Sequence, residues 1–297
     1  MSKLLRFAVA VLIISAAVPA AAAETDWSKV AQALGKEGSF QPGGVYRVGL
    51  PRSDLHVTLD GVAIKPGLAL GGWLAFEPMG NSAMVMGDLV LTQDEIAPVM
   101  KKFEEGGVEI TALHNHLLRA EPMTLYMHVL GNGDPVKLAQ TLHAGLALSK
   151  TPLQTAAQPA AAPPAIDFDT GAVDKAMGYK GKNTGGIYQF TISRAKPVTE
   201  GGMEIPGAMG SAIGINFQPT GSGKAAITGD FVLSANEVNP VIKALAASGI
   251  KVTALHSHML TEQPRLFFMH FWANDDASKL ARGLRGALDR IDVKKSG

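Results

Sequence analysis

The sequence predicts an α+β fold: a tandem duplication of a mostly antiparallel sheet unit with two helices and a histidine-bearing β-hairpin. Three observations predict it. A pentapeptide recurs 142 positions downstream, strand-like segments precede a capped helix in both copies, and the same three histidines lie near the end of each copy. Strands and helices that are grouped along the chain are typical of α+β folds and not of strictly alternating ones.

The duplication is visible without any structural assumption. Gly87–Leu91 (GDLVL) recurs as Gly229–Leu233 (GDFVL), and the same offset carries Thr111–His114 onto Thr253–His256 without a gap. A similarity that stays in register over this length indicates a duplicated structural unit. The sequence leaves open whether the two units pack into one pseudo-twofold body or remain separate.

Four segments follow from the repeat and from composition. Residues 1–23 are predicted to be a signal peptide, 24–148 the first repeat unit, 149–165 an Ala/Pro-rich linker and 166–297 the second repeat unit. The signal is predicted from a basic start, a short apolar run and a small-residue end. That run is also too short for a membrane span of about 20 residues. We therefore expect a periplasmic or secreted protein without stable membrane insertion after signal cleavage.

Strands are predicted in the first part of each unit, where β-branched and aromatic residues alternate between Gly and Pro. In the first unit they are Val45–Leu50, His56–Leu59, Ala69–Phe76 and Ala83–Leu91.

Helices are predicted where capping signals occur. Thr92–Glu95 and Ser234–Glu237 are capping boxes, so helices should follow to about residues 105 and 248. Asp134-Pro135 and Asp276 mark the start of a second helix in each unit.

A hairpin carries the histidines of each unit. We expect its strands at Val108–Leu118 and Thr124–Leu130, with counterparts at Ile250–Leu260 and Leu266–Trp272. The alternation of a strand places one face on the core and leaves the histidine face free to line a cleft. Met127 should then belong to the core.

The expected register brings the histidines together. A turn near Glu121 sets His128 opposite His114 and Tyr126 opposite His116, at cross-strand distances of about 5 Å. Three imidazoles can then converge on one ion, as in catalytic zinc sites with an open fourth position. The predicted metal ligands are His114, His116, His128, His256, His258 and His270. Zinc or another divalent transition metal is the expected cofactor.

Other interpretations of the same residues stay open. The histidines could serve only as hydrogen-bonding residues, and a metal-free module could bind a cell-envelope glycan or peptide between histidines and aromatic rings. A metal-dependent hydrolase is a third alternative, although no residue is assigned as catalytic. Possible ligand-binding residues are Tyr126, Phe268, Trp272, Arg52 and Arg194. A solvated surface position is the alternative for the two arginines, and a purely turn-organising role is the alternative for the matched Asp88 and Asp230.

Composition excludes several classes of function. The chain has 27 basic and 26 acidic residues, and losing Lys3 and Arg6 with the signal changes the net charge from +1 to −1. Bulk charge therefore gives no reason to expect nucleic-acid binding. Cysteine is absent, which excludes disulfides, thiolate metal sites and a lipidated cysteine.

The histidine segments also carry a family resemblance. Ala112–Leu118 (ALHNHLL) and Ala254–Leu260 (ALHSHML), together with the Gly-Asp strands, make the chain resemble the LppY/LpqO-like family of uncharacterised exported bacterial proteins. The resemblance implies an exported protein and no particular activity. The named members are lipoproteins, and this chain departs from them because it has no cysteine to lipidate.

Overall fold

The computed structural model describes residues 25–153 and 163–295. The predicted signal peptide, residues 1–23, lies outside the described residues, as do residues 154–162 of the predicted linker. Within the described ranges, no helix is long and apolar enough to cross a membrane.

The first repeat forms a six-stranded sheet in the order β1-β2-β5-β6-β8-β7, with every neighbouring pair antiparallel. Its elements are α1 (Trp27–Leu34), β1 (Ser39–Phe40), β2 (Tyr46–Pro51), β3 (Val57–Leu59), β4 (Val62–Ile64), α2 (Pro66–Ala69), β5 (Gly71–Met79), β6 (Ser82–Thr92), α3 (Gln93–Glu105), β7 (Glu109–His114), β8 (Thr124–Gly133) and α4 (Pro135–Leu146).

The second repeat forms the matching sheet β9-β10-β13-β14-β16-β15, also antiparallel throughout. Its elements are α5 (Thr170–Met177), β9 (Lys182–Thr184), β10 (Ile187–Ile192), β11 (Thr199–Glu200), β12 (Met203–Glu204), the 3-10 turn η1 (Gly207–Met209), β13 (Ile213–Gly221), β14 (Lys224–Leu233), α6 (Ala235–Ala247), β15 (Lys251–His256), β16 (Phe267–Asp276) and α7 (Ala277–Leu288). The predicted α+β duplication is confirmed.

Each repeat also begins with a helix that the sequence analysis did not predict. Asp26 caps α1 by accepting the Ser28 amide, and Asp169 caps α5 by accepting the Ala172 amide. Each of these helices has only eight residues and buries two apolar side chains. A pattern this short is weak in the sequence, and packing against the rest of the repeat stabilises the helix.

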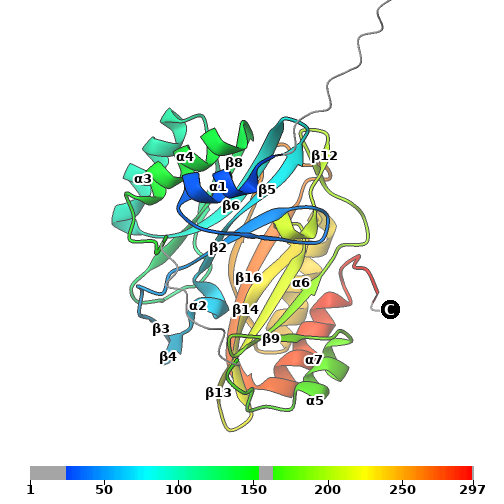
Figure 1. Cartoon of the computed structure of the whole chain (residues 1–297). Helices are drawn as coiled ribbons and strands as arrows, with labels where there is room; N and C mark the ends of the chain where they lie inside the picture. The colour runs from blue at the N-terminus through cyan, green and yellow to red at the C-terminus, as the bar shows by residue number, and fades with distance from the viewer. Residues whose placement is uncertain (1–24, 154–162, 296–297) are drawn as a thin grey trace, which may run out of the picture.

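The two sheets pack face to face, with helices on both outer sides (Figure 1). Successive side chains of a strand point to opposite faces. On β6, Leu89 and Leu91 therefore face the helical side and join the core of the first repeat. Met86 and Val90 face the other sheet, where they pack in clusters that contain second-repeat residues. The molecule thus has four layers: helices, sheet, sheet, helices.

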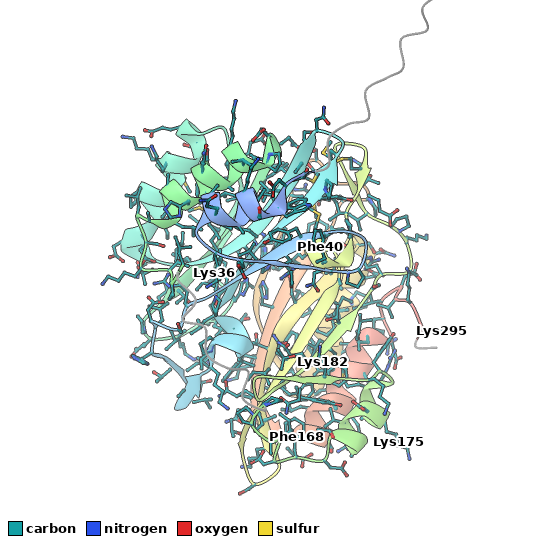
Figure 2. The ribbon with its side chains drawn as sticks, viewed as in Figure 1. Lys36, Phe40, Phe168, Lys175, Lys182 and Lys295 are labelled. Atoms are coloured by element: carbon teal, nitrogen blue, oxygen red, sulfur yellow. The ribbon has the colours of Figure 1, made fainter. Side chains whose placement is uncertain are left out.

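Polar contacts also join the two repeats. Asn115 Nδ2 donates to the Thr253 carbonyl at 3.2 Å, and the Thr253 hydroxyl donates to the His116 carbonyl. Side chains fill the space around the strands, while lysines such as Lys175 and Lys295 lie exposed at the edge (Figure 2). The two repeats therefore pack into one body and do not remain separate, a point that the sequence leaves open.

The histidine hairpin differs from its prediction in length and register. β7 ends at His114, so His116 lies in the connection to β8 and not on a strand. His114 pairs with Tyr126, and His128 pairs with Ala112, two positions from the expected partner. The long connection between His114 and Thr124 sets this register, which differs from that of a simple turn at Glu121, and the irregularity between Ile110 and Ala112 shifts the far end of the pair by one further residue.

The faces of the hairpin also differ from expectation in part. Met127 and Met269 are fully buried, as predicted for core residues. The histidine face does not line an open cleft, since His128 is 4% exposed and His270 is 2% exposed. The prediction failed because the second repeat covers that face, and a strand pattern alone cannot indicate the covering sheet.

Candidate metal centre

All six hairpin histidines meet between the two sheets. His114 stacks on His256 with ring centroids 3.4 Å apart. His116 stacks on His270 and His128 stacks on His258, each at 3.7 Å. Every pair joins one histidine of each repeat, so the two trios form two stacked layers.

Distances within each trio support the layered arrangement. His114 lies 5.1 Å from both His116 and His128, with ring planes 22° and 16° apart. His256 lies 4.9 Å from both His258 and His270, at 29° and 17°. Aromatic rings close the outer faces of the stack, Tyr126 on His116 at 3.3 Å and Phe268 on His258 at 3.5 Å.

A carboxylate completes each trio. Asp88 Oδ2 lies 3.9 Å from His116 Nε2, and its Oδ1 lies 3.6 Å from His128 Nε2. Asp230 Oδ2 lies 3.6 Å from His258 Nε2, and its Oδ1 lies 3.9 Å from His270 Nε2. Each repeat therefore contributes three imidazoles and one carboxylate to the cluster.

The polar atoms that face the cluster lack hydrogen-bond partners. The Nε2 atoms of all six histidines are buried and unpaired, as are Oδ1 of Asp88 and Oδ1 of Asp230. A buried polar atom without a partner costs about 1–3 kcal/mol, and nearly all such atoms in native proteins are paired. Eight of them in one interior, six nitrogens and two oxygens, form a donor set of the kind that can hold a metal ion.

Backbone carbonyls fix the tautomer of three of the histidines. The Nδ1 atoms of His114, His256 and His270 lie 3.2, 3.4 and 2.8 Å from the carbonyl oxygens of Asn115, Ser257 and Gly229, respectively. A carbonyl can only accept, so Nδ1 carries the proton and Nε2 presents its lone pair to the cluster. Metal-binding histidines are usually oriented in this way by a second hydrogen bond.

Burial keeps the histidines neutral. Desolvation lowers the pKa of His114 to about 4, and desolvation together with the nearby His114 lowers the pKa of His256 to about 3. For the other four, burial followed by repulsion from neighbouring imidazoles lowers the pKa well below the usual value of 6.5. Neutral imidazole is the form that binds metal.

Burial acts on the carboxyl groups in the opposite direction. Desolvation raises the pKa of Asp88 to about 7, although the charge of Arg47 partly offsets it. Burial and then repulsion by Asp88 raise the pKa of Asp230 well above its usual value. Arg47 itself stacks over the indole of Trp73 at 4.2 Å and donates to the Ala208 carbonyl. A cation therefore stands near one carboxylate of the pair.

Three donor groups have atoms that all lie within 4.8 Å of one another: His114/His116/His128, Asp230/His258/His270 and His114/His256/His270. The first is the trio predicted from the sequence of the first repeat. The third mixes the two repeats because the layers are in contact. Nitrogen donors with a carboxylate suit Zn, Cu, Ni and Fe and not Ca or Mg, which prefer oxygen.

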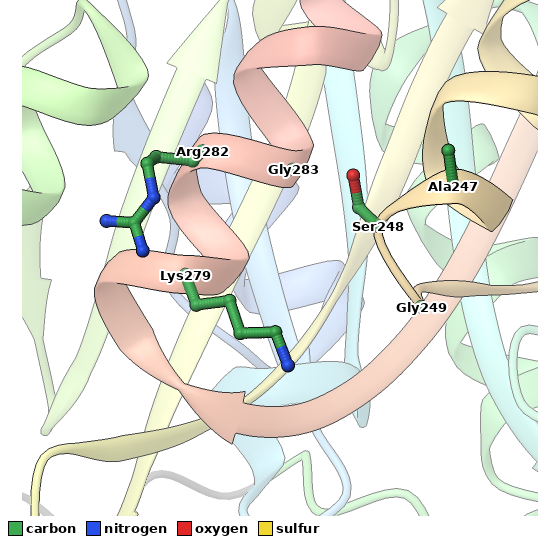
Figure 3. Close-up of a pocket in the computed structure, with 6 residues that line it drawn as sticks. All are labelled: Ala247, Ser248, Gly249, Lys279, Arg282 and Gly283. Atoms are coloured by element: carbon green, nitrogen blue, oxygen red, sulfur yellow. The ribbon is translucent and has the colours of Figure 1, made fainter.

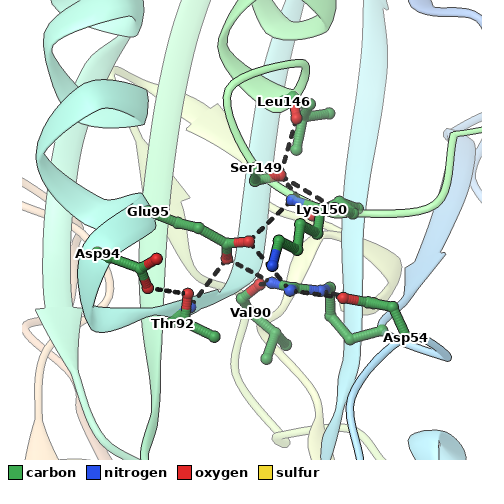
Figure 4. A network of polar contacts seen from close by, with 10 residues as sticks. Asp54, Val90, Thr92, Asp94, Glu95, Leu146, Ser149 and Lys150 are labelled. Carbon is green, nitrogen blue, oxygen red and sulfur yellow. Dashed lines mark hydrogen bonds and ion pairs between the residues drawn. The ribbon is translucent and has the colours of Figure 1, made fainter.

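The two arginines proposed for ligand binding lie elsewhere and have another role. Arg52 is fully buried, and its guanidinium donates to Asp54 at 2.9 Å and to the Val90 carbonyl and Glu95 at 2.7 Å each; Asp54, Val90 and Glu95 are labelled in Figure 4. Arg194 repeats the pair with Glu237 at 2.8 Å. The expectation of a surface or ligand-binding position is therefore corrected: these side chains neutralise buried glutamates of the capping boxes.

The predicted aromatic ligand-binding residues divide between two places. Tyr126 and Phe268 lie on the histidine stack, with exposures of 1% and 0%. Trp272 is buried away from the stack, where its Nε1 donates to Asp60 at 3.1 Å. Tyr126 and Phe268 are therefore interface residues that line no open cleft, whereas Trp272, although 1% exposed, borders a surface cavity away from the histidines.

Sequence reasoning missed Asp88 and Asp230 as members of the site. A signal was present, because both stand at the same place in the repeated Gly-Asp strand. The preceding glycine is also constrained, since a Cβ on Gly229 would lie 2.1 Å from the Gly214 carbonyl oxygen. A charged residue in the buried middle of a mostly apolar strand needs a partner for its charge, which indicates a functional role better than it indicates a turn.

Two surface cavities lie outside the cluster. One, of about 440 Å³, is lined by Lys279, Arg282 and the segment 247–249 (Figure 3), and the other, of about 320 Å³, includes Asp60 and Trp272. Neither is lined by a histidine of the cluster. Lys279 is paired with Asp275, and none of the residues that line the first cavity has a buried, unpaired side-chain atom within the part of the chain that the structure describes.

The chain belongs to the family described as Domain of Unknown Function (DUF1259), whose model matches it twice, at residues 28–148 and 171–290. No curated protein matched the chain. Among solved structures, the crystal structure of a trimeric bacterial microcompartment shell protein PduB is 13% identical and covers 88% of this chain and 97% of that chain, with a TM-score of 0.22. A similarity at that TM-score does not establish a shared fold.

Proposed function

We propose that this is an exported protein that binds a divalent transition metal in one centre built by both repeats. The single observation that carries the proposal is the set of eight buried, unpaired donor atoms at the sheet interface. Six imidazole nitrogens and two carboxylate oxygens meet there, and burial holds the histidines in the neutral form that binds metal.

A metal ion resolves the energetic problem of this interior. Lone pairs that point at one another repel, and water molecules could bridge only some of them in so crowded a space. A divalent cation accepts several lone pairs at once and offsets the buried carboxylate charge. Histidines that serve only as hydrogen-bonding residues would need a donor or an acceptor within hydrogen-bond distance of Nε2, and none is found among the described residues, since the aspartate oxygens lie 3.6–3.9 Å away.

Export is the second part of the proposal. The basic start with Lys3 and Arg6, the short apolar run and the small residues up to Ala23 support a cleaved signal. The resemblance to LppY/LpqO-like exported proteins supports the same location. N-terminal sequencing of the protein recovered from the periplasm or medium should begin at Glu24. Recovery of the uncleaved chain in the cytoplasm would contradict this part alone.

Elemental analysis tests the metal centre. The mature chain, purified without a histidine tag, should contain at least one equivalent of a transition metal, or bind it after incubation and washing. His114→Ala combined with His116→Ala should lower the bound metal. His56→Ala is the matched control, because His56 is exposed and outside the cluster. Absence of metal from the native protein under all loading conditions would refute the proposal.

A further inference from the structure

The ring planes of the second repeat define how an ion could sit among its donors. A metal lies in the plane of each imidazole that binds it. The rings of His256, His258 and His270 are mutually inclined by only 17° to 31°. Three planes so nearly parallel can share one ion only when they are nearly the same plane. The donor nitrogens must then surround the ion within a layer.

The distances between the rings of that layer leave room for a fourth ligand. His256 lies 4.9 Å from each of its two neighbours, whereas His258 and His270 lie 6.5 Å from each other. Asp230 occupies the wide side, within 3.9 Å of both of these nitrogens. The donor atoms of Asp230, His258 and His270 lie within 4.8 Å of one another, and the ring of His256, 4.9 Å from both of the other rings, supplies a third nitrogen to the layer.

The first repeat has the same arrangement. His114 lies 5.1 Å from both His116 and His128, and Asp88 lies within 3.9 Å of the nitrogens of those two. The donor groups His114/His116/His128 and Asp230/His258/His270 share no residue. One ion in each layer would therefore not compete with the other for ligands.

The stacking of the layers fixes the distance between two such ions. The three cross-repeat ring pairs have centroid separations of 3.4, 3.7 and 3.7 Å. Ions seated in the two layers would lie at about the same separation as the rings. Two-metal centres in enzymes have ions about 3.5–4 Å apart, so the layer spacing matches that class of site.

Planar coordination also discriminates among metals. Zinc prefers a tetrahedral set of ligands. Planar or tetragonal sets of nitrogen and oxygen donors favour Cu²⁺ or Ni²⁺, and Cu²⁺ binds most tightly among the divalent first-row ions. The thiolate ligand of electron-transfer copper sites is absent, because the chain has no cysteine, and Met127 and Met269, next to the histidines in sequence, face the helical side.

We propose that the interface is a binuclear centre for two Cu²⁺ ions, each held in one planar layer of three histidines and one aspartate from a single repeat. This inference rests on the proposed metal-binding function and adds the number of ions, their separation and their identity. The layers consist of His114, His116, His128 and Asp88, and of His256, His258, His270 and Asp230.

Copper titration followed by electron paramagnetic resonance tests the proposal. The tag-free, full mature chain is stripped with chelator and titrated with Cu²⁺ alone, and bound copper is measured by elemental analysis. We expect two Cu²⁺ per chain. The doubly loaded protein should show less signal from isolated Cu²⁺ than its copper content requires, together with a half-field transition, because two ions so close couple magnetically.

Variants separate the two layers. His116→Ala and His258→Ala should each bind one Cu²⁺ tightly and give the full signal of an isolated ion, while His56→Ala should behave like the wild type. Two ions without magnetic coupling, or a wild-type capacity of one ion, would overturn the binuclear inference and leave metal binding intact. Failure to bind any transition metal would overturn both. The wild-type titration decides the question even if a variant does not fold.

Discussion

The two repeats have the same buried Arg–Glu pairs but differ in the charged residues around the histidine cluster. Arg52 and Arg194 make equivalent buried pairs with Glu95 and Glu237, each of which also accepts a backbone amide at the start of its helix. Both glutamates accept a further amide from the segment that follows the last helix of the repeat. The two buried Arg–Glu pairs therefore make the same hydrogen bonds in both repeats.

The surroundings of the two aspartates are not duplicated. Arg47 lies near Asp88, whereas the matching position of the second repeat is Gln189, which bonds to Asn216 and the Gly67 carbonyl. The stacked ring is Tyr126 on one side and Phe268 on the other. Packing geometry is thus symmetric while electrostatics is not, and we infer that the two layers bind metal with unequal affinity.

The largest effect, on the free energy of unfolding, is expected from removing the arginine of either buried Arg–Glu pair. Arg52→Met or Arg194→Met leaves a buried glutamate without its partner, which typically costs about 3–5 kcal/mol. Arg52→Met should lower the free energy of unfolding more than Arg194→Met does, because Arg52 also binds Asp54. Urea denaturation measures the free energy of unfolding. Arg119→Met removes an exposed pair with Asp60 and should cost only about 0–1 kcal/mol. Equal losses in Arg52→Met and Arg119→Met would contradict the comparison.

Acid should destabilise the metal-free protein. The folded-state pKa values of the six histidines lie below 6.5, so unfolding takes up protons once the pH falls below about 6.5, and stability falls with it. The raised pKa values of Asp88 and Asp230 act in the opposite direction, but two carboxyls are outnumbered by six imidazoles. The melting temperature should therefore drop between pH 7 and pH 5. A constant or rising melting temperature would refute this sign.

The same titration can compare the repeats. Replacing His116 and His128 by Gln, or His258 and His270 by Gln, should make the melting temperature depend less on pH, and by a similar amount in each case. A large difference between the two double variants would show that burial of the trios is less symmetric than the ring geometry indicates.

A moderate effect on metal affinity is expected at Arg47. Arg47→Gln gives the first repeat the residue of the second and removes a cation near its layer. The positive charge of Arg47 repels a divalent cation, so its removal should tighten binding of the ion in the first layer by at least roughly tenfold. Calorimetric titration should show tighter binding of one ion and more similar affinities for both. Lys101→Gln, an exposed position on α3, is the control. Unchanged affinities would show that Arg47 does not cause the asymmetry.

The smallest effect is expected from Tyr126→Phe. The Tyr126 hydroxyl donates to the Ala69 carbonyl at 2.6 Å, and losing one such bond costs about 0.5–1.5 kcal/mol. Metal content should not change, because the phenyl ring of Phe268 already stacks on the other layer. A loss of metal together with the hydroxyl would instead make Tyr126 part of the centre.

The sequence by itself determined the duplication, the antiparallel strands and the starts of the main helices. These features depend on local interactions: a fixed 142-residue offset, alternation along strands, and capping boxes such as Thr92–Glu95. It also identified all six histidines, because their spacing recurs in both copies. Local chemistry decides such features wherever the chain is placed.

Only the tertiary structure decided that the two trios are one site. The long connection between β7 and β8 sets a register two positions from the expected one, and the covering sheet converts an expected cleft into a buried interface. The tertiary structure also places Asp88 and Asp230 beside the histidines, and it places Arg52, a predicted ligand-binding residue, in a buried ion pair elsewhere. Burial between the two sheets depends on residues that are about 140 positions apart in the sequence. The desolvation of the histidines and aspartates therefore cannot be predicted from any one segment of the chain.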